Sequence, residues 1–372
     1  MRDTTAGNKL LQLEALRGFA ALYVVLHHTI HVNYFVAGLD IGRLLRFGQE
    51  AVILFFLISG FVINHSFRTG NDFTFRTYFI KRFTRIYIPL FVVFAVGFLT
   101  ESFNAGQWVV VGLKPLVLNL LMLQDAGGMK PGVIVEPLLN NGPLWSLSYE
   151  WWFYMLYYPI IRLFSNHQSQ NVLVFSVAVV ASGLYVLYPG FATRLFAYMG
   201  IWWAGVFLSN LYLDEKPFLF RNCLPVIAVL SAISGILSIK VIDAVLDGQL
   251  VLLGLHPLLE LRHFGFALAA VIIAVLWHRW RWRGFDTLFA PFLVLAPISY
   301  VLYISHYHVM VSATYLDFIE NPLIEYLMYF AILLLFSWLV ERVLYPLVRQ
   351  WVYKRSRHGR SDLVFANKTT QF

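Results

Sequence analysis

Ionisable side chains inside long apolar stretches are the first residues to consider for chemistry. In LEALRGFAALYVVLHHTIH, Arg17 and His28 are eleven positions apart. At about 100° per residue, this spacing places both on one helical face, roughly 16 Å apart along the axis. Such groups cost about 2.5–3.5 kcal/mol inside a bilayer, so the pair indicates function. An arginine that reaches the membrane surface and a histidine satisfied within a helix bundle are the structural alternatives.

A second group of reactive side chains lies in NGPLWSLSYEWWFYMLYYP, where Ser146 and Glu150 are four residues apart and stack on one helical face. In the topology derived below, Glu150 lies at a depth similar to that of His28. A carboxylate near an imidazole would fix its tautomer and raise its basicity, as a general base for a hydroxyl requires. The alternative is an interfacial glutamate among the neighbouring tryptophans.

A third group is contained in ISYVLYISHYHVM, where Ser299, Tyr303 and His306 follow the i, i+4, i+7 pattern of a single helical face. The predicted helix runs outward, so His306 also falls in the outer half of the membrane. The alternative is a stripe of side chains that form hydrogen bonds between helices.

Two arginines, Arg82 and Arg85, lie one helical turn apart in KRFTRIYIP, where an apolar span begins. Paired guanidinium groups bind phosphates bidentately. Taken alone, such arginines are more often the positive charge that flanks a membrane span on its cytoplasmic side. In FFLISGFVI, Ser59 and Gly60 fall in the middle of a span, where glycine commonly marks a close contact between helices.

These side chains must be positioned by membrane-spanning helices. The chain has 372 residues, of which 59% are hydrophobic and 13% charged, against about 25% charged residues in soluble domains. The fold class is therefore all-α, a polytopic transmembrane bundle. The predicted spans are 14–36, 49–66, 86–102, 145–164, 171–188, 193–212, 223–241, 263–278, 288–312 and 324–347.

The net charge of +8 is concentrated in short segments between spans and at the end of the chain. This pattern is typical of loops beside anionic membrane lipids and does not indicate a nucleic-acid partner. With the N-terminus inside, the basic loop 67–85 is cytoplasmic. If 107–124 crossed the membrane fully, the basic segments 279–283 and 354–372 would face outward.

We therefore predict a re-entrant or interfacial segment near 107–124, within an outward excursion at 103–144. The bundle then has ten spans and both termini are cytoplasmic. Residues 1–353 form the transmembrane domain. Residues 354–372 form a basic cytoplasmic tail, which we expect to be disordered.

Taken together, these patterns resemble the acyltransferase 3 family of integral membrane O-acyltransferases, which acylate bacterial surface carbohydrates. The resemblance runs in order through an Arg-x10-His pair at 17 and 28, FFxxSGF at 55–61, RxxRIxxP at 82–89, WSLSxE at 145–150 and SYxLYxxH at 299–306. Many members have two acidic residues after WSLS, whereas here Glu150 is followed by Trp151 and Trp152. Glu150 is thus alone in the acidic role.

The resemblance implies a donor and an acceptor on opposite sides of the membrane. An acyl-CoA, usually acetyl-CoA, would bind from the cytoplasm at Arg82, Arg85 and Arg17, with Ser59 and Tyr303 completing its site. The acyl group would meet a carbohydrate hydroxyl at His28, helped by the other catalytic candidates, which are Glu150, Arg17, Ser146 and His306. The expected location is the inner membrane of a bacterium, and the oligomeric state stays open.

We hypothesise that His28 acts as general base for the acceptor hydroxyl, which attacks the thioester directly or through an acyl-enzyme. The acceptor is expected to be a cell-surface, exported or lipid-linked glycan. Four tryptophans near the predicted outer surface offer faces on which sugars stack, although an interfacial belt explains at least two of them. They are Trp108, Trp145, Trp151 and Trp152.

Two other classes of protein remain as alternatives. A transporter or flippase for a glycan or lipid-linked sugar also places His, Arg and Glu within the membrane. A metal or haem protein would use His27, His28, His31, His306 and His308, but no cysteine or acidic partner is close to the first three. We therefore expect no metal.

Overall fold

The protein is an assembly of helices. A computed structural model describes residues 4–30, 35–36 and 39–352; the predicted tail at 354–372 lies outside this part of the chain. The helices are α1 (Thr4–Thr29), α2 (Ile41–Leu44), α3 (Gly48–Arg68), α4 (Phe75–Asn104), α5 (Leu113–Leu120), α6 (Trp145–Leu163), α7 (His167–Leu187), α8 (Phe191–Leu213), α9 (Phe220–Leu246), α10 (Leu258–Arg279), α11 (Phe285–Phe289), α12 (Ser299–His306) and α13 (Pro322–Trp338). In the described residues, the strands are β1 (Phe35–Val36) and β2 (Leu39–Asp40), which pair antiparallel.

The predicted membrane bundle is confirmed. Eight helices of the described chain are long and apolar enough to cross a membrane, and a pair bent by 47°, Phe285–Val294 with Ala296–Val311, makes a ninth crossing if it counts as one span. The remaining predicted span coincides with α6, which has 19 residues. Its many Trp and Tyr side chains make α6 less apolar than the other spans.

The segment 107–124 does not cross the bundle, as predicted. Its only helix among the described residues is α5, with eight residues. At 1.5 Å per residue this helix is about 12 Å long, far short of the ~30 Å hydrocarbon layer. The connection between α4 and α6 therefore begins and ends on the same side of the bundle.

The loops that connect successive long helices lie alternately at two opposite ends of the molecule. At one end, Tyr158 Oη donates to the carbonyl of Phe73 at 2.9 Å, and Arg68 pairs with Asp214 at 3.2 Å. We call this the basic end, because its loops and helix termini carry Arg76, Lys81, Arg162, Lys216, Arg221, Arg279, Arg281 and Arg283. At the opposite end, backbone N–H groups of Phe191 and His256 donate to the 105–144 connection, at Gly132 and Met129.

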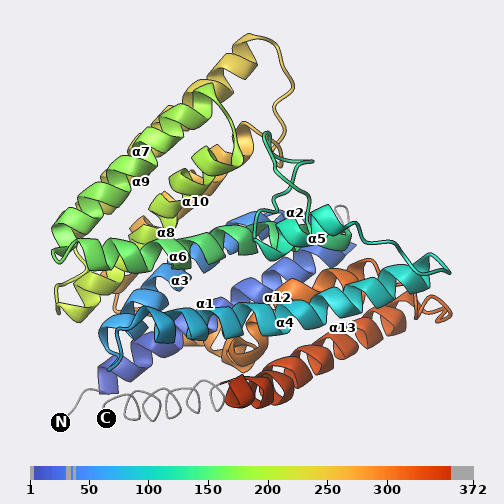
Figure 1. Ribbon diagram of the computed structural model, residues 1–372. Helices are drawn as coiled ribbons and strands as arrows, with labels where there is room; N and C mark the ends of the chain where they lie inside the picture. The colour runs from blue at the N-terminus through green and yellow to red at the C-terminus, as the bar shows by residue number, and fades with distance from the viewer. Residues whose placement is uncertain (1–3, 31–34, 37–38, 353–372) are drawn as a thin grey trace, which may run out of the picture.

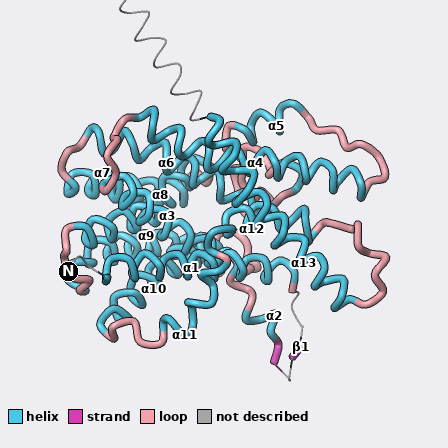
Figure 2. Tube along the Cα trace, turned by 90° about the horizontal axis from the view of Figure 1, so that it is seen from below, coloured by secondary structure: helices cyan, strands magenta, loops and turns pink. Residues whose placement is uncertain are grey.

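Helix α1 lies at the centre of the arrangement. It packs against α3 on one side and against α12 on the other. Figures 1 and 2 agree that α4 and α13 lie on the side of α12 that faces away from α7 and α9. Residues of α1, α3, α4, α6 and α12 can therefore converge in the middle of the bundle, between α4 and α13 on one side and α7 and α9 on the other.

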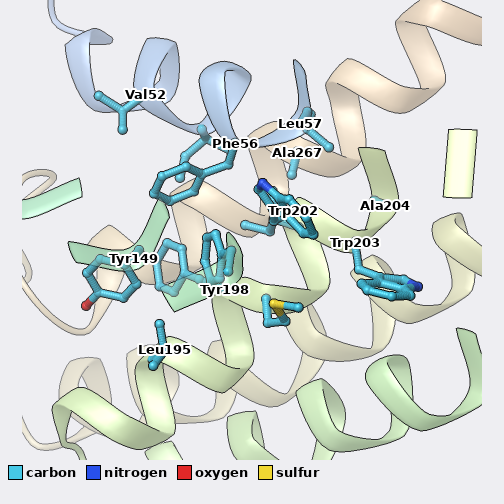
Figure 3. Close-up of a cluster of buried hydrophobic side chains, with 14 of the residues drawn as sticks. Val52, Phe56, Leu57, Tyr149, Leu195, Tyr198, Trp202, Trp203, Ala204 and Ala267 are labelled. Atoms are coloured by element: carbon cyan, nitrogen blue, oxygen red, sulfur yellow. The ribbon is translucent and has the colours of Figure 1, made fainter. Parts of the chain in front are cut away.

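The core is built where α8 packs against α3 and α6. Figure 3 shows Phe56 of α3 beside Tyr149 of α6 and Tyr198 of α8, and both of those rings have centroids 6.3 Å from the Phe56 ring. Gly60 brings α3 against α8, since a Cβ on Gly60 would come within 2.0 Å of the carbonyl oxygen of Trp202. The predicted role of Gly60 in close helix contact is thus confirmed.

Candidate active site

A cavity of about 150 Å³ lies where these helices converge. Its wall contains every residue that the sequence analysis proposed for catalysis or donor binding except the two histidines, His28 and His306. The polar and charged lining residues are Arg17 from α1, Ser59 from α3, Arg82 and Arg85 from α4, Ser146, Glu150 and Tyr154 from α6, and Ser299, Tyr300 and Tyr303 from α12. Five motifs that are far apart in sequence therefore share one site.

Two of the three arginines in the cavity wall are already paired with carboxylates. Arg17 lies 2.8 Å from Glu14, and its Nε donates to Ser299 Oγ at 3.1 Å. Arg85 forms an ion pair with Glu341, a buried residue of the π-helical segment Leu339–Leu344 that follows α13. The charges of these two arginines are therefore largely balanced within the protein.

Arg82 differs from the other two arginines. Among the described residues it has no carboxylate partner, and its Nε is buried without a hydrogen-bond partner. Its guanidinium carbon lies 5.7 and 5.8 Å from the ring centroids of Tyr78 and Tyr154, which are favourable cation–π positions. Arg82 is therefore the cation of this wall that is left to bind an anion.

Hydroxyl groups join α12 to the start of α6. Tyr303 Oη donates to the carbonyl of Pro143 at 2.7 Å. Because that bond uses the only proton of the phenol, Ser146 is the donor in its 2.8 Å hydrogen bond with Tyr303. Both side chains are thus fixed in the wall of the cavity.

The two histidines lie together beyond Tyr303. The ring centroids of His28 and His306 are 5.2 Å apart. His306 Nδ1 is 2.6 Å from the carbonyl oxygen of Tyr303, and because a carbonyl only accepts, Nδ1 carries the proton. In the neutral ring, Nε2 then offers a lone pair; it is buried and has no hydrogen-bond partner in the described part of the chain. Such an imidazole is suited to accept a proton.

The prediction that Glu150 lies at a depth similar to that of His28 is wrong. Glu150 Oε1 instead accepts hydrogen bonds from Ser59, at 2.8 Å, and from Tyr154. No hydrogen bond or ion pair within the described residues joins Glu150 to His28.

The depths of the two side chains explain this difference. Ser146 is level with Tyr303, one turn before His306, and Glu150 lies a further turn toward the basic end. Glu150 is therefore about 10 Å from the level of the histidines along the helix axes. Periodicity assigns a face to each residue, but it does not set the relative depth of two separate helices.

The predicted faces themselves are confirmed. Arg17 and His28 both point from α1 to α12, where Arg17 contacts Ser299 and His28 lies beside His306. Successive positions along α12 therefore mark a path from the arginines, through Tyr303, to the pair of histidines.

Sequence reasoning missed Tyr154 and Tyr300 of this wall, and it missed Glu341, which contacts Arg85 from outside the lining. Glu341 neutralises Arg85, and Tyr154 donates to Glu150. Glu341 lies inside the predicted span 324–347, so the rule that an ionisable group within a span indicates function would have selected it. Tyr154 had no comparable signal, because tyrosines are common throughout this chain.

The four tryptophans proposed to meet a sugar separate into different environments. Trp145 and Trp151 are buried, and Trp152 Nε1 donates to the carbonyl of Met122 at 2.9 Å. Trp108, by contrast, is 73% exposed, with one face stacked on Phe98. The expectation of a sugar platform is therefore wrong for the two buried tryptophans and stays a prediction for Trp108.

The histidines considered for a metal do not gather into a ligand set in the described part of the chain. No group of three or more His, Cys, Asp or Glu side chains there could hold a metal ion. His31, one of the residues considered, lies outside the described residues.

Comparison with known proteins agrees with the site. The family model described as an acyltransferase domain matches residues 10–342. Acyltransferase MdmB of Streptomyces mycarofaciens is 33% identical over 168 residues, which are 41% of this chain and 40% of that protein. Nodulation protein 10 of Rhizobium leguminosarum bv. viciae is 29% identical over 182 residues, 45% of this chain and 49% of that protein.

The chain thus spans less than half the length of each of these relatives. No solved structure matches it. The family match, however, covers the five motifs and every residue that lines the cavity. The chain therefore belongs to the acyltransferase 3 family.

Proposed function

We propose that this protein is an O-acyltransferase, in the simplest case an O-acetyltransferase, that transfers an acyl group from acyl-CoA to a hydroxyl of a cell-surface or exported carbohydrate. The observation that carries the proposal is the order of the charged and basic side chains along the site. An unpaired arginine, Arg82, lines one part of the cavity, and a pair of histidines lies beyond Tyr303. A donor with phosphates at one end and a thioester at the other matches this order.

The donor is proposed to enter from the basic end. By the positive-inside rule, this end faces the cytoplasm, and the membrane is proposed to be the inner membrane of a bacterium. Arg82 binds a donor phosphate, because no carboxylate of the described chain competes for it. Arg17 and Arg85 add positive potential while remaining paired with Glu14 and Glu341. Ser59, Tyr303 and Glu150 line the path of the thioester arm, where a carboxylate oxygen can accept an amide N–H of that arm.

The transfer step is proposed to occur beside the two histidines. His28 removes the proton of the acceptor hydroxyl while the hydroxyl oxygen attacks the thioester carbonyl. The carbon–sulfur bond breaks, and the thiolate of CoA leaves with the proton that His28 received. His306 holds its Nε2 lone pair close to the same proton, and Ser146 and Tyr303 fix the wall opposite. Formation of an acyl-histidine before transfer gives the same products, and trapping labelled protein distinguishes the two routes.

The acceptor is proposed to reach the histidines from the opposite end. Trp108 is exposed at that end, beside a polar side chain, Gln107, and offers a face on which a sugar ring can stack. A glycan or a lipid-linked saccharide fits this arrangement.

The test measures release of free CoA in membranes that contain the protein. Acetyl-CoA is supplied with and without a bacterial extract of lipid-linked saccharides and surface glycan. The proposal predicts CoA release that depends on the extract and on Arg82. Movement of saccharide across the membrane without thioester consumption would instead establish the transporter class.

A further inference from the structure

A cluster of buried charges lies outside the cavity, near the opposite end of the bundle. Arg194, on the first turn of α8, contacts Asp125 Oδ2 through Nη2 at 2.5 Å and through Nε at 2.9 Å. Lys130 Nζ lies 2.9 Å from Asp125 Oδ1. The Asp125 and Arg194 side chains are 0% exposed, and that of Lys130 is 1% exposed. We call Asp125, Lys130, Arg194 and Tyr149 the Asp125 cluster.

The Asp125 cluster holds α6 through two aromatic side chains. Tyr149 Oη donates to Asp125 and accepts from Arg194 Nε at 2.7 Å. Lys130 Nζ lies 3.3 Å from the ring centroid of Trp145. Trp145 and Tyr149 are one turn apart on α6, so the cluster contacts two consecutive turns of one face.

Those two turns also carry residues of the cavity wall. Ser146 follows Trp145, and Glu150 follows Tyr149, so each cavity residue is rotated by about 100° from a residue that the cluster holds. The start of α6 at Leu144 has no side-chain cap. The rotation of this end of α6 therefore depends on side-chain contacts, among which those of the cluster are charged and directional.

Stability alone is a weak reason for such a cluster. Buried ion pairs lose much of their attraction to desolvation, and apolar replacements are often as stable. Desolvation also lowers the pKa of Lys130 to about 8, although Asp125 opposes the shift. The cluster does impose strict geometry, because both oxygens of Asp125 are held: Oδ2 accepts from Arg194 and Tyr149, and Oδ1 accepts from Lys130.

We propose that Asp125, Arg194 and Tyr149 are positioning residues for acyl transfer, which set the rotation of α6 and so hold Ser146 and Glu150 in the cavity wall. The inference rests on the proposed function. It assigns the 121–137 connection a role in the site, although that connection contributes no residue to the cavity wall.

The kinetic test uses Tyr149→Phe, which removes one hydroxyl and leaves the Asp125–Arg194 pair intact. Misplacement of a catalytic group by about 1 Å can cost up to about 10²-fold in rate. We expect kcat for acetyl transfer to the glycan extract to fall at least tenfold. The KM for acetyl-CoA, which depends mainly on Arg82, should change less than kcat. The melting temperature in detergent should fall by only a few degrees, because one buried hydrogen-bonding hydroxyl is lost.

The matched control is Tyr158→Phe on the same helix, which removes the hydrogen bond to Phe73 at the basic end. It should leave kcat unchanged. The proposal is overturned if Tyr149→Phe keeps the wild-type kcat. It is also overturned if kcat returns to the wild-type value when Tyr149→Phe is assayed well below its own melting temperature, because the cluster would then be structural only.

A second measurement does not depend on activity. In a Cys223→Ala background, which removes the only cysteine of the chain, Ser146→Cys places one thiol in the cavity wall. We expect Tyr149→Phe to change its rate of modification by hydroxyethyl methanethiosulfonate several-fold, and Tyr158→Phe to leave the rate unchanged. Equal rates would refute the positioning role. Absence of acyl transfer in the wild type would refute the proposed function, while the labelling rates would still test the cluster.

Discussion

Replacement of Arg82 by alanine separates donor binding from folding. Arg82 lines the cavity, and its Nε has no hydrogen-bond partner among the described residues. Because Arg82 has no carboxylate partner among the described residues, its removal does not leave a carboxylate there unpaired. Arg85→Ala has the opposite character, because it leaves Glu341 buried and unpaired.

The magnitudes follow from these contacts. A hydrogen bond to a charged group contributes about 1.5–3 kcal/mol. Loss of one such contact to a donor phosphate therefore corresponds to roughly a ten- to 150-fold increase in the KM for acyl-CoA. Removal of one partner from a buried ion pair costs about 3–5 kcal/mol of stability. Since Arg85 is itself only partly buried, we expect the lower part of that range for Arg85→Ala.

The assay combines steady-state acyl transfer with thermal unfolding in detergent. For Arg82→Ala we expect a higher KM for acetyl-CoA at an unchanged melting temperature. For Arg85→Ala we expect a lower melting temperature. Arg82→Lys should recover part of the affinity, because a lysine supplies the charge without the planar fork.

The reasoning is refuted if Arg82→Ala binds acetyl-CoA as tightly as the wild type. It is equally refuted if Arg82→Ala unfolds at a lower temperature than Arg85→Ala, since Arg82 would then be the arginine that stabilises the fold.

Two further predictions concern stability. Gly60→Ala should lower the melting temperature, because its Cβ would come within 2.0 Å of the Trp202 carbonyl oxygen and force α3 away from α8; such overpacking costs about 1–3 kcal/mol. Gly183→Ala, where nothing lies within 4 Å of the new Cβ, is the control and should not lower it. For Lys130, the folded pKa of about 8 lies below the ordinary value of 10.5, so between these pH values the unfolded chain binds the extra proton. The stability of the wild type relative to Lys130→Met should therefore be constant below pH 8 and rise above it, by at most about 1.4 kcal/mol per pH unit. Thermal unfolding of both proteins from pH 6 to 10 measures this, and a relative stability that falls above pH 8 contradicts the assignment.

Local sequence pattern predicted much of this architecture. The spans followed from apolar length, and the faces of α1 and α12 followed from the helical repeat that relates Arg17 to His28 and Ser299 to His306. Charge counting also identified 107–124 as a segment that does not cross. These properties depend on neighbouring residues in sequence, which is why a single chain reveals them.

Relations between distant helices could not be obtained in this way. The depth of Glu150 relative to His28 depends on how α6 and α1 slide against each other, and no local pattern fixes that displacement. The pairing of Arg85 with Glu341 joins positions 256 residues apart.

The Asp125 cluster was missed for a related reason. Asp125 and Lys130 lie in a connection, and Arg194 lies at the start of a span. Charges at such positions are normally solvated or interfacial. Burial arises only when the connection folds back over the start of α8, as its contact between Gly132 and Phe191 shows.

The measurement that tests the central claim most directly is transfer of radiolabelled acetyl from acetyl-CoA to glycan or lipid-linked saccharide in bacterial membranes, with the wild type and with His28→Ala. The account predicts label in the saccharide fraction for the wild type and its loss in His28→Ala, while binding of acetyl-CoA is retained through Arg82. Near-complete transfer by His28→Ala would contradict the assignment of His28 as the base at which donor and acceptor meet.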